Sequence, residues 1–483
     1  MPTSLLRRRL VLWTIALGVL VCIGTTAWAI ALVSRTGVPP RLLGPYLQWR
    51  SSGHNPLIER TGELTADVLA WLDRGSVKAR QQWPAWVAPL TSAAVRGGTR
   101  EVLVVDVGQL RAALTRALPG DVITIAPGRY RVEGAALALD RPGRVDAPIT
   151  VRAPRVGLAT LEFNLVEGFH VLAPHWVFEN LVIEGACAQH DDCEHAFHVV
   201  GAASATVIRN NELRDFNAHI KINGDRGRYP DGGLVANNRI YNTTARRTEN
   251  PVTLIDLVAA SDWTIRGNLV ADFVKDGSDR TSYGVFAKGG GSGNLLEGNT
   301  VLCEHRLRGA PGRRVGLSFG GGGSGQASCR AGKCTPEHDL GMMRDNLIAS
   351  CSDAGVYLNR ATNSRLEHNT LLDTAGVQTR SAGELLFMAN LVDGPLRIDA
   401  ESFLTARDSR TSALSALYLG VHAVRSLFAD AGALDLRWAG APPALSAPHA
   451  ARSDLCGAVA GQRQVIGAFE EISRCQRGDA STR

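Results

Sequence analysis

The sequence has few charged side chains and lacks the short motifs of several cofactor and metal sites. Asp, Glu, Lys and Arg make up 20% of the 483 residues, against about 25% in average soluble proteins. No CxxC pair occurs, and no group of Cys and His has zinc-ligand spacing, which argues against a structural zinc site. Neither Lys-Ser nor Lys-Thr follows Gly320–Gly323, so we interpret this run as a tight turn and not as a phosphate-binding loop. The 51 glycines show no G-X-Y period, which excludes collagen.

Long apolar runs are also scarce, because only Leu10–Val33 is uncharged over such a length. As a helix, this run would cross the roughly 30 Å hydrocarbon core of a bilayer. A single run excludes a polytopic membrane protein, and a hydrophobic content of 45% excludes global disorder. Three arginines at 7–9 precede the run and predict an inner-membrane anchor with a periplasmic domain. The alternative is a signal peptide cleaved near the A-x-A sequence at 27–29, which would give a secreted protein.

The cysteine content agrees with export from the cytoplasm. Of the nine cysteines, Cys22 lies within the apolar run. The other eight are Cys187, Cys193, Cys303, Cys329, Cys334, Cys351, Cys456 and Cys475. Because their number is even and several lie close in sequence, we expect them to form disulfides in an oxidising compartment.

A short pattern recurs through the middle of the chain: two apolar-leaning positions, two variable positions, Asn, and then further apolar residues. Its asparagines are Asn180 (in a weaker first copy), Asn211, Asn238, Asn268, Asn299, Asn346 and Asn369. Repeats of this length are typical of stacked architectures. Short segments in which apolar and polar residues alternate follow several of these asparagines and are interpreted as strands. The repeats therefore predict an all-β fold, a parallel β-helix or solenoid.

The repeated asparagines are expected at the corners of successive coils, stacked on one another. Their amides could bond backbone groups that a bend leaves unsatisfied. Cys303 and Cys351 follow Asn299 and Asn346 at nearly the same distance in coils close in the stack, which predicts a disulfide between them.

The flanking segments complete the predicted organisation. An amphipathic helix at 107–118 is expected to cap the first coil, as solenoids require, and another helix is expected at 65–74. The predicted order is a cytosolic tail at 1–9, a transmembrane anchor at 10–33, a periplasmic spacer at 34–100, the β-helix at 101–400 and a C-terminal closing segment at 401–483.

The segment Pro119-Gly120-Asp121-Val122-Ile123-Thr124-Ile125-Ala126-Pro127-Gly128-Arg129-Tyr130 and the ending Ile466-Gly467-Ala468-Phe469-Glu470 are typical of one superfamily. They resemble secreted right-handed parallel β-helix proteins of the pectate-lyase-like superfamily. Within it, the chondroitinase B and alginate lyase family looks nearest. The resemblance sets Lys288 where that family carries a catalytic Arg, and Ala259 where it carries a catalytic Lys. That family's calcium-binding carboxylates would fall near Asp256, where only one acid remains. The implied polysaccharide-lyase activity is therefore only partly matched.

Alternation within the predicted strands places one row of side chains on the outside of the coils. This row reads Lys221, Asp256, Phe286, Ser318 and Tyr357, and a second row two positions later includes Asn223, Lys288 and Asn359. The rows are interpreted as a glycan-binding groove in which Phe286 and Tyr357 could stack on sugar rings. Residues 201–320 carry a net charge of +4, which would attract a uronic-acid polymer.

Two loops beside this face supply further candidates. Residues 274–283 include Lys275, Asp276, Asp279, Arg280 and Tyr283, and residues 303–308 include His305, Arg306 and Arg308. Ordinary solvated turns are the alternative interpretation. For β-elimination we expect Lys288 or Lys275 as base, Arg280 and Arg306 on the substrate carboxylate, and Tyr283 or His305 as acid. Arg308 is expected to bind substrate.

Calcium is the one candidate cofactor, held by oxygen ligands from Asp256, Asp276 and Asp279. The expected partners are an acidic polysaccharide and the inner membrane, with no nucleic acid, because the chain shows no recognised nucleic-acid-binding motif. We expect a monomer. Three alternatives to a lyase stay open: a non-catalytic protein that binds or guides an envelope polysaccharide, a C5-epimerase, and a soluble hydrolase.

Overall fold

The computed structural model describes residues 12–21, 23–25, 28, 31, 35, 37–75, 78–87, 89–93, 98–321, 324–446, 453–459 and 464–477. The chain divides into two compact units. The smaller unit comprises residues 1–75 and 412–422, and the larger comprises 76–411 and 423–483.

The smaller unit contains two packed helices, α2 (Pro40–Ser51) and α3 (Pro56–Arg74), and the short helix α5 (Leu414–Leu417). The side chain of Asn55 caps α3 by accepting hydrogen bonds from the backbone of its first turn. A fully buried ion pair joins α2 to α3, with 2.6 Å between Arg41 Nη2 and Asp73 Oδ1. The helix expected at 65–74 is the second half of α3.

The anchor predicted at 10–33 lies partly outside the described residues. Within the part of the chain that the structure describes, no helix is both long and apolar enough to span a membrane. The anchor and the cytosolic tail therefore stay predictions.

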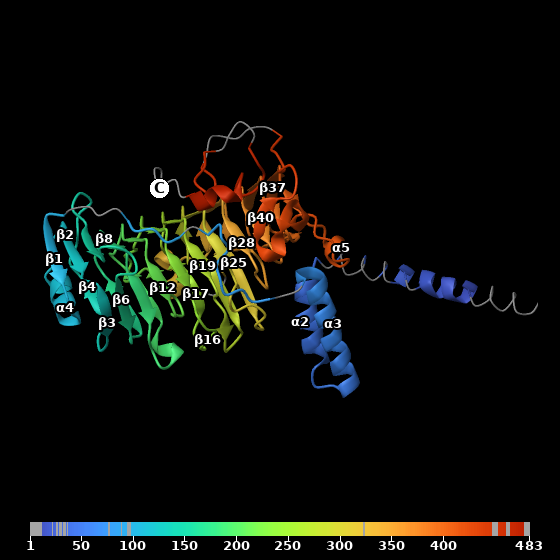
Figure 1. Ribbon diagram of the computed structural model, residues 1–483, viewed down its shortest axis with the longest axis horizontal. Coiled ribbons are helices and arrows are strands. Elements are labelled where there is room, and N and C mark those ends of the chain that lie inside the picture. Colours follow the sequence, from blue (N-terminus) through green and yellow to red (C-terminus); the bar gives the residue numbers. More distant parts are fainter. Residues whose placement is uncertain are drawn as a thin grey trace, which may run out of the picture. The chain divides into compact units, whose positions relative to one another are not determined.

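The larger unit is a solenoid of three parallel sheets, and each coil contributes one strand to each sheet in turn (Figure 1). One coil, for example, runs through β8 (Trp176–Glu179), β9 (Val182–Gly185) and β10 (His195–Val200). Neighbouring strands in all three sheets pair in parallel. This arrangement confirms the parallel β-helix that the repeated asparagine pattern predicted.

The three sheets contain twelve, eleven and ten strands. The twelve-stranded sheet has β1 (Arg100–Val104), β2 (Asp121–Ile125), β5 (Ile149–Arg152), β8, β11 (Val207–Arg209), β14 (Leu234–Ala236), β18 (Thr264–Arg266), β23 (Leu295–Glu297), β27 (Met342–Arg344), β31 (Ser364–Glu367), β34 (Glu384–Met388) and β37 (Phe403–Arg407). The eleven-stranded sheet has β3 (Gly128–Val132), β6 (Ala159–Phe163), β9, β12 (Glu212–Arg214), β15 (Arg239–Tyr241), β19 (Leu269–Ala271), β24 (Thr300–Leu302), β28 (Leu347–Ala349), β32 (Thr370–Leu372), β35 (Leu391–Val392) and β38 (Arg410–Thr411).

The ten-stranded sheet carries the row of polar side chains expected from the sequence. It has β4 (Leu137–Leu139), β7 (Glu167–Val171), β10, β13 (Ile220–Asn223), β17 (Val252–Val258), β21 (Thr281–Lys288), β25 (Arg313–Phe319), β29 (Val356–Asn359), β33 (Val377–Arg380) and β36 (Leu396–Arg397). Small sheets add β16 (Arg246–Arg247) with β20 (Lys275–Asp276), β22 (Gly291–Ser292) with β26 (His338–Asp339) and β30 (Ala361–Thr362), and β39 (Phe428–Asp430) with β40 (Asp435–Trp438).

Helix α4 (Val107–Thr115) covers the first coil, as expected of a solenoid cap. It begins at Asp106, whose side chain accepts a hydrogen bond from Gln109 N at 2.7 Å. Its apolar face is buried through Leu110 and Leu114. Near the C-terminus, the rings of Phe428, Trp438 and Phe469 contact one another.

A ladder of side-chain amides runs along one corner of the coils, from Asn211 to Asn390. Each Oδ1 accepts a hydrogen bond from the backbone N of the preceding ladder residue, at 2.8–3.1 Å. The members are Asn211, Asn238, Asn268, Asn299, Asn346, Asn369 and Asn390. The stacking predicted from the repeats is confirmed, and it extends one coil further, to Asn390.

Asn180 does not belong to this ladder, so that part of the prediction was wrong. Leu181 holds the ladder position in its coil, because its backbone N donates to Asn211 Oδ1 at 2.9 Å. Asn180 precedes it with a φ of 61°, as Asn210 precedes Asn211 with a φ of 55°. Its side chain instead accepts a hydrogen bond from Ala93 N. Asparagine suits both positions, one for its amide and the other for its tolerance of left-handed backbone.

Four disulfides join all eight cysteines that follow the apolar run: Cys187–Cys193, Cys303–Cys351, Cys329–Cys334 and Cys456–Cys475. The predicted bond between Cys303 and Cys351 is confirmed, and it links two adjacent coils.

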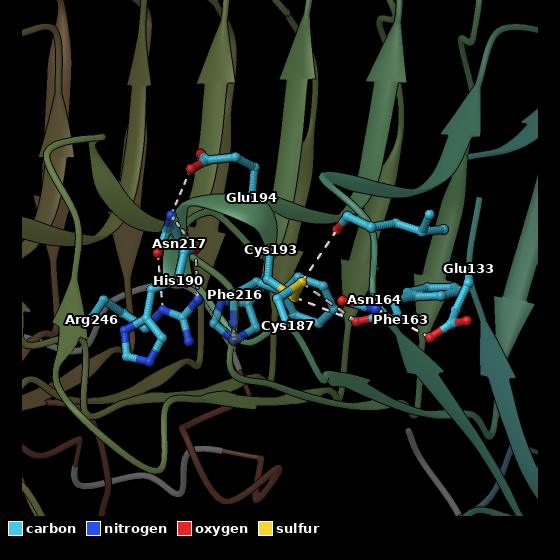
Figure 2. The surroundings of a disulfide bond; sticks show 12 residues. Glu133, Phe163, Asn164, Cys187, His190, Cys193, Glu194, Phe216, Asn217 and Arg246 are labelled. Carbon is cyan, nitrogen blue, oxygen red and sulfur yellow. Dashed lines mark hydrogen bonds between the residues drawn. A yellow bond between two sulfur atoms is a disulfide. The ribbon is translucent and has the colours of Figure 1, made fainter. Parts of the chain in front are cut away.

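The loop closed by Cys187–Cys193 leads directly into β10 and is held by polar contacts (Figure 2). Asn217 Nδ2 donates to Glu194 Oε1 at 2.6 Å, and Arg246 Nε donates to Asn217 Oδ1 at 2.9 Å. Burial raises the pKa of Glu194, although Asn217 and Asn250 oppose that shift by donating hydrogen bonds. These contacts fix the backbone immediately before the first strand residue, His195.

Two histidines are completely buried in the larger unit and should make its stability depend on pH. Burial lowers the pKa of His219 and of His338 to about 3, against about 6.5 in an unfolded chain. The unfolded chain therefore binds more protons between these values, so stability is full above pH 6.5 and falls as the pH drops towards 3. Each histidine contributes on the order of 5 kcal/mol across this window.

Urea unfolding monitored by circular dichroism between pH 7.5 and 4.5 would measure this effect. The matched variant is His338→Phe, because His338 stacks on Phe319 with ring centroids 4.1 Å apart and an aromatic ring could take its place. This variant should show a shallower loss of stability with falling pH. Equal slopes for the two proteins would show that His338 does not cause the effect.

Candidate functional site

The outward face of the ten-stranded sheet presents a continuous row of side chains from neighbouring coils. In register order the row is His170, His198, Lys221, Asp256, Phe286, Ser318 and Tyr357. Parallel pairing sets these residues directly beside one another, about 4.8 Å apart along the solenoid. The segment from Lys221 to Tyr357 is the row that alternation predicted, and Asn223 and Lys288 lie two positions later in their strands.

Two lysines flank one buried carboxylate at the centre of this row. Lys221 Nζ donates a hydrogen bond to Asp256 Oδ2, and Lys288 Nζ lies 3.7 Å from Asp256 Oδ1. The Asp256 side chain is 5% exposed, whereas each lysine is 22% exposed. Burial by itself would raise the pKa of Asp256, but Lys221 and Lys288 outweigh burial and hold it below its ordinary value. The cluster thus carries a net positive charge that faces solvent.

Aromatic rings adjoin the lysines. Lys288 Nζ lies 4.1 Å from the centroid of the Phe286 ring, and Tyr283 stacks on the same ring at 4.4 Å. Burial, together with nearby Tyr357 and Asp353, raises the pKa of Tyr283 to about 12. The Tyr283 hydroxyl therefore keeps its proton at neutral pH and can act as a proton donor.

Three expected substrate-binding residues are less accessible than the alternation suggested. Phe286 is only 6% exposed, because Gly321 lies over its ring so closely that a Cβ there would overlap it. Ser318 is fully buried, and its Oγ donates to Gly320 O at 3.1 Å. Asn359 is also buried. Tyr357 and Asn223 are partly exposed.

The loop that follows β25 forms one border of the face beside Lys288. Its disulfide Cys329–Cys334 closes a short turn, and Arg330 N donates to Gly289 O at 2.8 Å. Glu337 Oε2 accepts a hydrogen bond from Gly289 N at 3.0 Å. Part of the glycine run predicted as a tight turn, at 322–323, lies outside the described residues.

The 274–283 loop pairs largely with itself. Lys275 is 4% exposed, with its Nζ 3.2 Å from Glu249 O and 3.6 Å from Asp279 Oδ1. Arg280 pairs with Asp276 at 3.7 Å. The backbone of β20 holds Lys275 beside β16, so burial removes Lys275 from the solvent-facing position that a base would need.

The 303–308 loop is also engaged away from the lysine pair. His305 Nε2 lies 2.8 Å from Gln82 O, and its ring stacks on Trp83. Arg306 binds the buried carboxylate of Asp272 at 3.0 Å and contacts the rings of Trp83 and Tyr241. Residues 78–87, which belong to the segment expected as a periplasmic spacer, therefore cover this loop.

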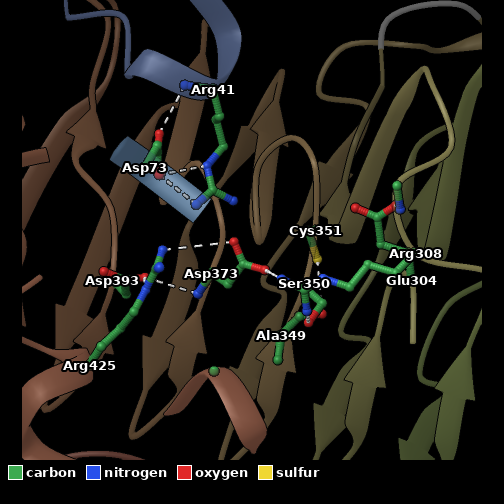
Figure 3. Close-up of polar contacts among 12 residues, drawn as sticks. Arg41, Asp73, Glu304, Arg308, Ala349, Ser350, Cys351, Asp373, Asp393 and Arg425 are labelled. Carbon is green, nitrogen blue, oxygen red and sulfur yellow. Dashed lines mark hydrogen bonds and ion pairs between the residues drawn. The ribbon is translucent and has the colours of Figure 1, made fainter. Parts of the chain in front are cut away.

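Arg308 reaches the next coils, where its guanidinium binds Asp373 Oδ2 at 2.5 Å and Ser350 Oγ at 2.8 Å (Figure 3). These partners make it a link between coils, and its side chain is only 9% exposed.

The three carboxylates proposed for calcium do not converge. Asp256 pairs with Lys221 and Lys288, Asp276 with Arg280, and Asp279 with Lys275. This arrangement does not fit a calcium site, because each carboxylate already neighbours a cation and each faces a different partner.

A cluster that sequence reasoning missed lies at the start of the outward row. Glu167 from β7 and His195 and His198 from β10 each place a ligand atom within 4.8 Å of the other two, the one such group among the described residues. His170 stacks on His198 with ring centroids 5.2 Å apart. Burial, and then His198, lowers the pKa of His195 to about 4. Extending the predicted row back by two coils would have revealed His198 and His170.

No protein-family model matches the chain, and no curated protein matches it significantly. Solved structures similar to it include pectate lyase Pel9A, which is 14% identical, with a TM-score of 0.48 over 78% of this chain and 97% of that one. A PL6 family polysaccharide lyase from Pseudopedobacter saltans is 11% identical, with a TM-score of 0.35 over 64% and 92%. A mannuronan C-5 epimerase A-module from Azotobacter vinelandii is 12% identical, with a TM-score of 0.37 over 65% and 97%.

Proposed function

We propose that this protein binds an acidic polysaccharide along the outward face of the ten-stranded sheet and cleaves it by β-elimination. The observation that carries the proposal is the pair of partly exposed ammonium groups, Lys221 and Lys288, around the buried carboxylate of Asp256. A net positive cluster on a regular, extended sheet face suits a polymer with one carboxylate on each sugar unit. The names of the similar solved structures, which include a pectate lyase and an alginate lyase, agree with this substrate class.

The contacts of the two lysines suggest different roles. Lys221 donates the hydrogen bond that holds Asp256, so its ammonium group is fixed in position. Lys288 is 3.7 Å from Asp256, beyond hydrogen-bonding distance, and its Nζ rests on the Phe286 ring. Lys288 is therefore the group that can turn towards a bound sugar at small cost.

In the proposed reaction, Lys221 neutralises the C6 carboxylate of the uronic acid, where charge develops in the transition state. Lys288 first releases its ammonium proton to solvent, and the free amine then removes the C5 proton. The electron pair forms a C4=C5 double bond as the C4–O bond breaks, and the Tyr283 hydroxyl donates a proton to the departing oxygen. Because the pKa of Tyr283 is raised, its hydroxyl is a weak acid and gives up this proton only as negative charge develops on the departing oxygen.

One observation favours the alternative of a non-catalytic binding protein. The resemblance to chondroitinase B and alginate lyases puts a catalytic Lys at position 259, but this chain has a buried alanine there. The Ala259 carbonyl accepts a hydrogen bond from Arg330 at 3.0 Å, so the position is part of the wall beside the face. A C5-epimerase shares the proton-abstraction step and stays the third candidate.

The test uses the full chain, with its disulfides formed, mixed separately with alginate, polygalacturonate and glycosaminoglycans. A rise in ultraviolet absorbance from the C4=C5 double bond with one polymer would support the lyase and identify its substrate class. Saturable binding without absorbance, and with an unchanged sugar spectrum by NMR, would support the binding protein. Altered C5 stereochemistry without absorbance would support the epimerase. If no polymer bound and no product formed, the result would contradict the proposal.

We also propose that the β-helix works outside the cytoplasm, anchored by residues 10–33 or released by cleavage near residue 29. The support is the four disulfides, since such bonds persist in oxidising compartments. Titration of free thiols in protein recovered from the periplasm, which should find none outside Cys22, would check this assignment.

A further inference from the structure

We propose that Glu167, His195 and His198 form a binding site for a divalent transition metal of the zinc type. Their ligand atoms already lie within 4.8 Å of one another, on two adjacent strands. Two imidazoles and one carboxylate are a complete set of three protein ligands for such a metal. The inference concerns metal binding and does not depend on the proposed polysaccharide activity.

The strands hold this cluster in place before any metal binds. His195 of β10 is paired with Glu167 of β7 in the parallel register, and His198 is three residues further along β10. The loop before β10 is fixed by the Cys187–Cys193 disulfide (Figure 2). Ligands on paired strands lose little conformational freedom when they coordinate, which favours a well-defined site.

Hydrogen bonds orient both imidazoles with one nitrogen directed into the cluster. His195 Nδ1 lies 3.0 Å from Ala218 O; a carbonyl only accepts, so Nδ1 carries the hydrogen and Nε2 is left as the ligand atom. His198 Nε2 lies 2.6 Å from Asn223 Oδ1, and Asn223 Nδ2 donates to Gly224 O at 3.0 Å. That amide orientation makes Asn223 the acceptor and leaves His198 Nδ1 for the metal. Such outer hydrogen bonds are the usual support of metal-binding histidines.

The contact between His198 and Glu167 also indicates a place for a cation. His198 Nδ1 lies 2.8 Å from Glu167 Oε1, so a nitrogen oriented as an acceptor faces a carboxylate oxygen. Two such atoms attract each other only when a cation lies between them, either a proton on the ring or a metal ion. A metal ion would bind both atoms after a small outward movement of the two side chains.

The donor atoms select the metal class. Imidazole nitrogen suits zinc, copper, nickel and iron, whereas calcium and magnesium prefer oxygen ligands alone. His170 Nδ1 lies 3.5 Å from Glu167 Oε2 and its ring packs on His198, so it closes one side of the cluster. The ligands are only partly buried, which leaves a coordination position for water or another group.

Isothermal titration calorimetry of the full chain, treated first with chelator, would test the site with zinc chloride and with calcium chloride. We expect one zinc ion per chain and no binding of calcium at this site. His195→Ala and Glu167→Gln should each weaken zinc binding by about 100-fold or more, and Asn223→Ala by about 10-fold through loss of orientation. His54→Ala, which removes an exposed histidine of the smaller unit, is the matched control and should bind zinc as the parent does.

Circular dichroism of each variant would show that the β-helix is intact. Glu167→Gln keeps the size of its side chain, so it tests the site even if His195→Ala disturbs the fold. Cobalt(II) absorption bands that appear with the parent and disappear in Glu167→Gln would give the same answer without zinc. Absence of zinc binding, or equal binding in the parent, His195→Ala and Glu167→Gln, would overturn the inference whatever the polymer assay shows.

Discussion

Replacing Lys288 by alanine should reduce cleavage of the acidic polymer by about 10²–10⁴-fold while leaving the β-helix folded. The loss is large because the proposed reaction has no other group positioned to remove the C5 proton. The structural cost is small, since the side chain is partly exposed and contacts chiefly Asp256, at 3.7 Å, and Phe286, at 4.1 Å. Initial rates of ultraviolet absorbance give the activity, and circular dichroism gives the fold.

A second substitution distinguishes the role of Lys288 as a base from its role in binding the negatively charged polymer. In Lys288→Arg the guanidinium can occupy the same place above Phe286 and beside Asp256, but it keeps its proton under all ordinary conditions. Polymer binding should therefore persist while cleavage stays lost. Lys78→Ala removes an exposed lysine outside the site and should leave both properties unchanged. Undiminished cleavage by Lys288→Ala would remove Lys288 from the mechanism.

Replacing Asn299 by alanine should destabilise the β-helix by about 4 kcal/mol or more. The amide of Asn299 accepts hydrogen bonds from Asn268 N and Nδ2 at 3.1 and 3.0 Å. It donates to Ile265 O at 2.8 Å and to Asn346 Oδ1 at 3.0 Å. All these groups are buried in the corner. The substitution removes all four hydrogen bonds, and a buried group left without a partner, as Asn268 N would be, costs about 1–3 kcal/mol. Urea unfolding with the disulfides intact would measure the loss.

Asn242→Ala is the matched control for this prediction. Asn242 is as completely buried as Asn299, yet neither atom of its side-chain amide makes a hydrogen bond among the described residues. Removing it therefore leaves no ladder partner unsatisfied and should change stability by less than about 1 kcal/mol. If the two variants lost stability equally, the effect would come from lost volume and the ladder would not be the cause.

The sequence was sufficient to predict the solenoid because its signal is repeated. A buried amide is required at the same corner of every coil, so Asn211, Asn238 and Asn268 recur at one-coil intervals. Alternation within each strand likewise predicted the row from Lys221 to Tyr357. The Cys303–Cys351 disulfide followed from the same frame. The prediction that Asn180 belongs to the ladder was wrong by one residue. Asparagine also suits the left-handed backbone position that directly precedes the ladder position, and Asn180 occupies that position.

Other features of the site depend on how coils and loops pack. Arg306 binds Asp272 and packs against Trp83. The residues next to it in the sequence do not distinguish it from an exposed arginine that could bind substrate. Lys275 is buried where β20 pairs with β16, and its ammonium group contacts Glu249 O. Sequence by itself determined the fold, the coil frame and the outward row, because these follow from a repeated local pattern. Only the tertiary structure decided which outward residues stay accessible, and that Glu167 meets His195 and His198, because those contacts join strands of two different coils.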